Sequence, residues 1–375
     1  MKRGLYMSLS NEIEEKAKEI KTDGYPMSIG ELINLYKDGD LTVFPEYQRY
    51  FRWSISQKSD LIESLLLGIP IPPIFVSQDK DGKWDIVDGL QRISSIFEFV
   101  GILKDKDGIK YNPSVLIGTK FLPSLEGKMW ESDDEGKSFT EAERRIIKRR
   151  KINIIIIDSI NNPTAKYELF QRLNTNGAEL TDQEMRNCLM IMIDKNFYNN
   201  IKKVCEYSKF KNITSLSERL ISQQYDKELV IRYIVARNKD LSTVNSNEDI
   251  GKYLTDKILD IIIDKDYDMT KDIDELKRSI NLLDKSLGSN SFKKSNPDKE
   301  NKFEGQFLLS SYEAILVGIS ENIEYWENNN PLLEEKIKSI YTNEVYNNAT
   351  SRGKRPILRF KELVDLSRKF FGNEN

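Results

Sequence analysis

The stretch WDIVDGLQRISSIFEF, residues 84–99, decides how the first half of this chain folds. Its first part reads as a strand that stops at Gly89, and the apolar residues that follow recur at the spacing of a helix. The apolar run IPPIFVS at 71–77 reads as a neighbouring buried strand, and the DKDGK segment at 79–83 has the composition of a hairpin turn. The sequence therefore predicts a strand, a hairpin, a second strand and a helix in succession.

Asp88, Gln91 and Arg92 are expected where the second strand meets the start of that helix. The first turn of a helix has free N–H groups and carries the positive end of the helix dipole, so it favours an anion. An arginine beside it can bind a phosphate through two parallel hydrogen bonds. The pattern therefore indicates a phosphate-binding corner.

Working outward, the remaining elements also follow from apolar spacing and end signals. LIESLLLG at 61–68 predicts a helix that ends on Gly68, and INIIIID at 152–158 predicts a buried strand. Residues 104–138 are rich in loop-forming residues and suggest an insertion or a mobile surface loop. We expect an α+β domain over 25–190 and a mainly α-helical domain over 191–375, where apolar residues recur three or four apart. Further helices are predicted over 11–20, 27–37 and 139–151, and a loop over 289–302.

Three blocks in this order resemble the N-terminal domain of the GmrSD-type restriction endonucleases: QRYFRW (48–53), DLIESLLLGIPIPPIFV (60–76) and DIVDGLQRISSIFEF (85–99). More distantly, they are similar to the ParB/sulfiredoxin fold. The resemblance implies a ParB/sulfiredoxin-like domain that binds a nucleoside triphosphate with Mg²⁺ and hydrolyses it slowly. Leu90 departs from the family, which commonly has a second polar glutamine there, and this bears on nucleotide contact and hydrolysis.

The same resemblance implies roles for individual residues. A second block, LFQRLNTNGAELTDQEMRN at 169–187, is similar to an arginine–asparagine–glycine element of the family. Glu184 is also explained by a capping box that begins at Thr181. The implied catalytic residues are Asp88, Gln91 and Arg92, the nucleotide-binding residues are Gln48, Arg49, Gly89, Arg172 and Asn174, and the Mg²⁺ ligands are Asn174 and Glu184.

Two segments suggest contacts with nucleic acid. Tyr47 and Arg52 lie in a run of interleaved aromatic and basic residues, a composition that can stack bases and hold phosphates. The other segment, RRIIKRRK at 144–151, includes Arg149 and Arg150 and suits the phosphate backbone. The competing interpretations are an aromatic core for the first segment and a solvated helix face for the second.

The composition excludes several classes of protein. The 375 residues include no histidine, which removes Ser-His-Asp hydrolases, HExxH zinc enzymes and the HNH nuclease domain that many GmrSD-type proteins carry. The net charge of −3 indicates that any DNA contact is local, and the two cysteines form no metal or disulfide pattern. With no apolar run of membrane-spanning length and no signal peptide, we expect a cytoplasmic protein that uses no membrane.

The sequence thus favours a sensor or switch in prokaryotic defence against foreign DNA, acting with a separately encoded effector or nuclease. A second reading is a non-catalytic DNA-binding or regulatory module. A third is a nicking enzyme with Asp85, Asp88 and Glu63 around Mg²⁺, in which Glu63 faces the site rather than the solvent. A homo-oligomer is compatible with each.

Overall fold

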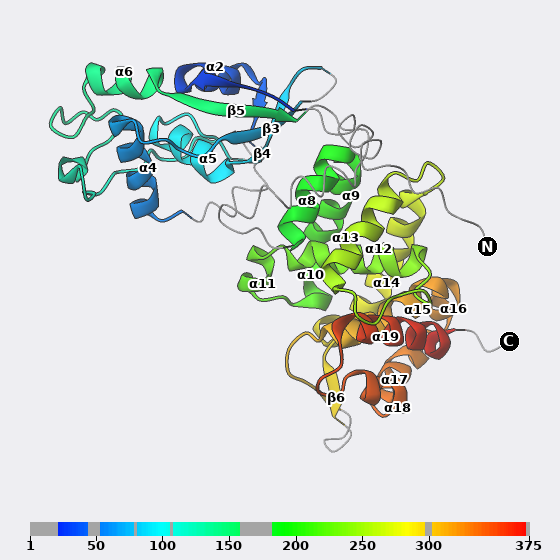
Figure 1. Cartoon of the computed structure of the whole chain (residues 1–375). Helices are drawn as coiled ribbons and strands as arrows, with labels where there is room; N and C mark the ends of the chain where they lie inside the picture. The colour runs from blue at the N-terminus through cyan, green and yellow to red at the C-terminus, as the bar shows by residue number, and fades with distance from the viewer. Residues whose placement is uncertain are drawn as a thin grey trace, which may run out of the picture. The chain divides into compact units, whose positions relative to one another are not determined.

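The chain forms two units, each with its own core (Figure 1). A computed structural model describes residues 22–43, 53–78, 81–105, 108–157, 182–296 and 302–372. The described part of the first unit is residues 22–157, and that of the second is residues 182–372. The predicted domain division at residue 190 remains a prediction, and the helix expected over 11–20 lies outside the described residues.

The first unit is an α+β domain built on a mixed sheet of five strands in the order β1-β5-β3-β4-β2. β3 pairs antiparallel with β4, as a hairpin requires, and parallel with β5, whereas β1 pairs antiparallel with β5. The expected strands at 71–77, 84–89 and 152–158 are therefore present, each within a few residues of its predicted ends. The strands are β1 (Thr22–Ser28), β2 (Leu41–Thr42), β3 (Ile74–Gln78), β4 (Trp84–Asp88) and β5 (Lys151–Ile157).

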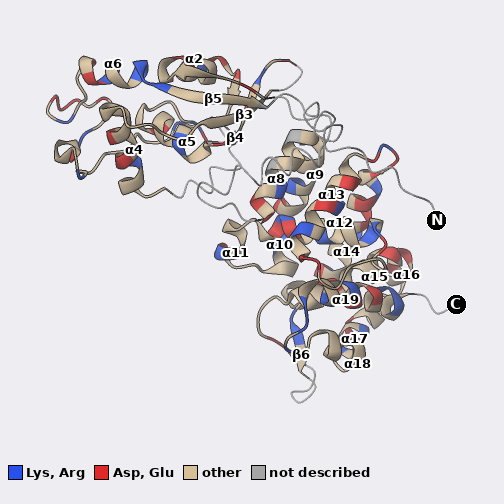
Figure 2. Ribbon diagram, in the orientation of Figure 1, with Lys and Arg blue, Asp and Glu red and all other residues tan. Residues whose placement is uncertain are grey.

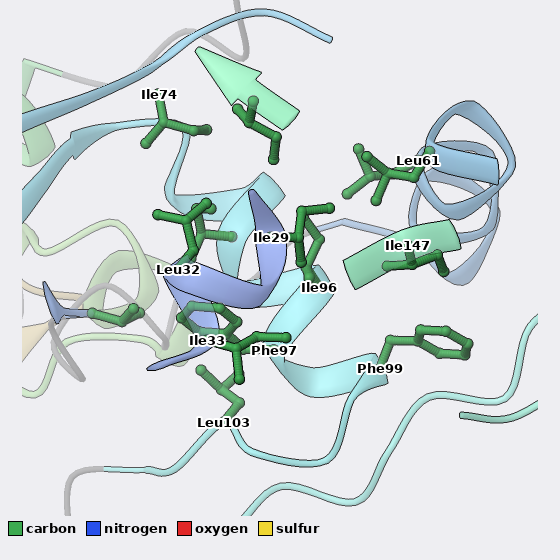
Figure 3. Packing of buried hydrophobic residues seen from close by; sticks show 14 of the residues in the cluster. Ile29, Leu32, Ile33, Leu61, Ile74, Ile96, Phe97, Phe99, Leu103 and Ile147 are labelled. Carbon is green, nitrogen blue, oxygen red and sulfur yellow. The ribbon is translucent and has the colours of Figure 1, made fainter. Parts of the chain in front are cut away.

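One hydrophobic core joins this sheet to four helices. Side chains alternate along the strands, so Ile152, Ile154 and Ile156 of β5 are buried while Asn153 between them is exposed. Figure 3 shows side chains of this core, among them Leu32 and Phe97 from two of the helices. The helices are α2 (Ile29–Asp38), α4 (Ile55–Leu67), α5 (Leu90–Phe99) and α6 (Glu141–Arg149).

Helix α4 is longer than its apolar run predicts. It begins at Ile55, because Ser54 and Gln57 form a capping box, and it ends at Gly68, whose φ of 79° needs a glycine. The segment 104–138 is not a simple surface loop either. Leu116, Leu125 and Trp130 are buried in the core, and a short 3₁₀ helix, η1 (Pro123–Leu125), interrupts the otherwise irregular backbone.

The second unit is helical, as the apolar spacing predicts. Helices α15 and α19 pack closely because Gly318 has no Cβ. A Cβ at this position would lie 2.0 Å from the carbonyl oxygen of Ser367. At the expected loop over 289–302, two short strands, β6 (Lys294–Asn296) and β7 (Lys302–Glu304), pair antiparallel, and β7 continues beyond the predicted end of the loop. The main helices are α8 (Asp182–Ile193), α9 (Lys195–Glu206), α10 (Ser208–Thr214), α11 (Glu218–Ser222), α12 (Tyr225–Asn238), α13 (Ile250–Ile262), α14 (Met269–Ser286), α15 (Leu309–Glu321), α16 (Ile323–Asn328), α17 (Asn330–Ile340), α18 (Glu344–Ala349) and α19 (Pro356–Phe371).

No helix in the described part of the chain is both long and apolar enough to span a bilayer.

Candidate functional site: a strand–helix corner

The corner predicted at residues 88–92 forms where β4 ends and α5 begins. Gly89 is the N-cap residue of α5 and has a φ of 90°, in the left-handed region that favours glycine. A Cβ at this position would lie 2.3 Å from Cδ1 of Ile74 and 3.0 Å from Nη2 of Arg92. The chain therefore needs glycine here both for its backbone conformation and for the close approach of the arginine.

Arg92 lies against this turn with little contact with solvent. Its side chain is 12% exposed, and Nη2 donates to the carbonyl oxygen of Pro73 and to the Asp88 carboxylate, each at 3.1 Å. The Asp88 side chain is 33% exposed. Within the described residues, Nε of Arg92 is buried and has no hydrogen-bond partner. The guanidinium group is thus positioned by two acceptors but keeps unused donor capacity.

The start of α5 adds N–H groups to that capacity. The first turn of a helix has N–H groups without intrahelical acceptors, and Gly89 has no side-chain oxygen to cap them. Leu90, the departure from the family pattern, is half-buried and packs against the core. Gln91, the third residue expected here, is half-buried on the same first turn. The arrangement can bind an anion such as a phosphate oxygen.

The described residues at the corner fit a phosphate better than they fit a metal ion. Asp88 is the carboxylate beside Arg92, and the described part of the chain contains no group of three or more acidic or cysteine side chains that could hold a metal. The proposed Mg²⁺ ligand Asn174 lies outside the described residues, as do the other predicted nucleotide and nucleic-acid contacts Tyr47, Gln48, Arg49, Arg52 and Arg172.

Glu184 lies in the second unit, on α8, where it is buried. Its predicted partners at the corner belong to the other unit, and its role as a Mg²⁺ ligand stays a prediction. Two neighbours on α8 matter more for packing than the sequence suggested. Arg186 is buried and Asn187 donates to the Gln224 side chain, and no local sequence signal separates them from surface residues.

Arg149 and Arg150, the predicted nucleic-acid contacts, have different environments. Arg150 donates from Nε to the carbonyl oxygen of Leu65 at 2.7 Å and from Nη2 to that of Leu66 at 3.0 Å. These carbonyl groups end α4, so Arg150 stabilises a helix C-terminus, a structural role that its place in a basic run did not reveal. Arg149 is exposed and makes no ion pair within the described chain. Figure 2 shows the basic end of α6.

Glu63 corrects both sequence interpretations, because it is neither solvated nor directed to the corner. It is buried, and Oε1 accepts hydrogen bonds from the Thr119 hydroxyl, from the Phe121 N–H at 2.9 Å and from the Leu122 N–H at 3.0 Å. The Thr119 hydroxyl, helped by the two N–H groups, lowers the pKa of Glu63 below its ordinary value despite burial. Glu63 therefore holds segment 104–138 to α4.

These features define an α+β domain with an arginine-bearing corner at a strand–helix junction. Residues 29–191 match the family model described as the GmrSD restriction endonuclease, N-terminal domain, and the match supports a domain of that family in this part of the chain. The match covers the sheet, the corner and most of α8. It supports a component of a restriction-like defence system. Neither the curated proteins nor the solved structures contained a match to this chain.

Proposed function

We propose that the chain is a nucleoside-triphosphate-binding switch of a prokaryotic DNA-defence system, acting with a separately encoded effector. The observation that carries the proposal is the unsatisfied donor capacity at the corner: Nε of Arg92, without a partner in the described residues, lies beside an uncapped helix start. A buried cation with a free donor is costly unless a ligand completes it, so the corner suits a phosphate oxygen.

Each corner residue has a role in this proposal. Arg92 and the first turn of α5 hold phosphate oxygens, and Asp88 fixes the orientation of Arg92 through its ion pair. Gly89 allows the backbone to approach closely. The family resemblance implies Asn174 and Glu184 as the residues that would hold Mg²⁺, which would neutralise charge in phosphoryl transfer. Positioning and charge stabilisation suffice for that chemistry, so the lack of histidine is no obstacle. A ParB/sulfiredoxin-like arrangement of the domain belongs to the same proposal.

The test is a thermal-shift titration of the purified chain with ATP, GTP, CTP and UTP in the presence of Mg²⁺. A ligand that binds only the folded state raises the melting temperature by mass action. We expect one nucleotide to raise it, and Arg92→Ala to abolish the shift. The matched control is Arg145→Ala, since Arg145 is an exposed arginine of the same unit that pairs with Glu141 at 3.5 Å.

A non-catalytic DNA-binding module is the second candidate, and Arg149 on α6 favours it, because it is exposed and has no ion pair with any described residue. No shift with any nucleotide, together with a DNA affinity that falls steeply with salt and weakens in Arg149→Ala, would support this module instead. A stand-alone nicking enzyme finds less support. Glu63 is committed to segment 104–138, and the described residues hold no cluster of carboxylates for a metal.

A further inference from the structure

The first unit contains a cavity at the other end of β4 from the corner. It has a volume of about 350 Å³ and is lined by residues of β1, α2 and the start of β4. β4 runs from Trp84, which lines the cavity, to Asp88 at the corner. Four residue steps along the strand place Trp84 and Asp88 roughly 13 Å apart, so the two sites are distinct. The size suits a small ligand or one side chain.

Two aromatic rings form the apolar walls. Tyr25 of β1 and Trp84 of β4 have ring centroids 6.4 Å apart and planes inclined at 60°, and Met27 is part of the lining. Trp84 is 8% exposed, whereas Tyr25 is 43% exposed, which is high for so large a side chain. Both rings therefore line one cavity, and aromatic faces attract cations.

The polar part of the lining is negative. Glu31, Asp40 and Asp81 are among the described lining residues, and none of those residues is basic. Lys83 precedes Trp84 in the sequence but does not line the cavity. No ion pair joins Glu31 or Asp40 to a cation in the described part of the chain. The field in the cavity therefore opposes phosphate and favours a positive group.

The kind of cation follows from the same lining. A metal ion needs a close set of oxygen ligands, and the described residues contain no such cluster. Aromatic walls instead suit a soft, weakly hydrated cation that also has apolar surface, as an organic ammonium ion does. We propose that the Tyr25–Trp84 cavity binds an organic ammonium group, with the rings contacting its alkyl surface and Glu31 and Asp40 balancing its charge. This goes beyond nucleotide binding at the corner.

The test uses the chain labelled with 5-fluorotryptophan and followed by fluorine NMR. The sequence has four tryptophans, so Trp84 gives one assignable resonance and the others serve as internal references. Choline and n-butylammonium are the probes, and 3,3-dimethyl-1-butanol is the neutral isostere of choline. We expect the Trp84 resonance to shift saturably with an ammonium probe. The dissociation constant for the neutral alcohol should be at least about tenfold higher than that for the ammonium probe.

Tighter binding of choline would identify a quaternary ammonium ligand, and tighter binding of n-butylammonium a primary one, as in polyamines or lysine side chains. Tyr25→Leu should weaken binding about fivefold, and Glu31→Gln severalfold, since both residues lie at the exposed part of the lining where the fold tolerates change. Asp23→Asn is the control, because Asp23 is an exposed acid on β1 that does not line the cavity.

Equal affinity for the neutral alcohol, or no saturable shift at Trp84 with either ammonium probe, would overturn the proposal. Arg92→Ala should leave ammonium binding unchanged, because Arg92 belongs to the corner. The outcome is therefore independent of whether the corner binds a nucleotide.

Discussion

Arg92 in the first unit and Arg186 in the second are both buried arginines with a glutamate or aspartate partner, yet they use their donors differently. Arg186 is 1% exposed and donates from Nε to Gln183, from Nη1 to the carbonyl oxygen of Gly251 and from Nη2 to Glu228, each at 2.9 Å. Arg92 makes both of its hydrogen bonds through Nη2, and no described residue accepts from its Nε.

The difference separates an arginine that holds helices from one that is available to a ligand. Arg186 begins a chain of ion pairs that runs through Glu228, Arg232 and Glu313 to Arg359, and so links α8, α12, α15 and α19. Arg92 pairs with an acid that is one-third exposed. Full use of donors indicates a structural role, whereas partial use beside a helix start indicates a site.

The largest loss of stability should come from replacing Arg186, whose Nε, Nη1 and Nη2 all donate hydrogen bonds. Arg186→Met should lower the free energy of unfolding by about 3 to 5 kcal/mol, because it removes a fully buried guanidinium and leaves part of the charge of Glu228, whose side chain is 17% exposed, uncompensated. Urea denaturation measures this change. Arg186→Lys is the companion variant, which keeps the positive charge but loses the planar set of five donors. Its free energy of unfolding should lie between those of Arg186→Met and the parent. A loss below about 1 kcal/mol for Arg186→Met would contradict the comparison.

A substitution at Gly89, in the turn before α5, should give the next largest loss of stability. Gly89→Ala should cost roughly 3 kcal/mol, since a left-handed conformation and crowding against Ile74 each contribute about 1 to 3 kcal/mol. Gly39→Ala separates the two causes. Gly39 has a φ of 84° with nothing within 4 Å of the added Cβ, so only the backbone cost applies. Equal losses in the two variants would show that the turn is not crowded.

Glu63 tests whether a buried acid of the first unit has a structural role comparable to that of Arg186. Glu63→Gln should cost about 1 to 2 kcal/mol at neutral pH, because charge-assisted hydrogen bonds from Thr119, Phe121 and Leu122 weaken. Glu126→Gln is the matched control, an exposed acid that accepts from Gly118 in the same segment. It should change stability much less.

The pH dependence of that difference has a definite sign. The folded-state pKa of Glu63 is lowered, chiefly by the Thr119 hydroxyl, so its stabilising contribution is complete above the unfolded-state pKa near 4.5. The contribution is lost as the pH falls through the folded-state pKa. Parent and Glu63→Gln should therefore differ fully in free energy of unfolding at about pH 6 to 7 and converge only as the pH falls below the unfolded-state pKa of Glu63. A constant difference across this range would show that Glu63 is not ionised in the fold.

The smallest loss of stability should come from replacing Arg92, whose Nε has no hydrogen-bond partner among the described residues. Arg92→Met should lower the free energy of unfolding by about 1 kcal/mol or less, because water can reach the one-third-exposed Asp88. The same variant should lose nucleotide binding in the thermal-shift titration. A large loss of stability in Arg92→Met would place Arg92 with Arg186 among the structural arginines.

Local patterns account for what the sequence predicted correctly. The β3–β4 hairpin and α5 follow from alternation, turn residues and helical spacing within about thirty residues, and the end of α4 follows from Gly68. β1 was not predicted, because its exposed residues 23–26 carry no apolar alternation. The start of α4 was missed because its first two turns are polar and only the capping pair Ser54–Gln57 marks them.

By itself, the sequence determined the α+β unit, the helical half, the strand–helix corner and the match of residues 29–191 to the GmrSD N-terminal domain model. Each depends on residues close together in the chain, where spacing sets which face is buried. Only the tertiary structure decided which charged groups are satisfied. Glu63 and Thr119 are 56 residues apart in the sequence, Arg186 and Gly251 are 65 apart, and Arg150 and Leu65 are 85 apart. Such hydrogen bonds form only when the chain has folded.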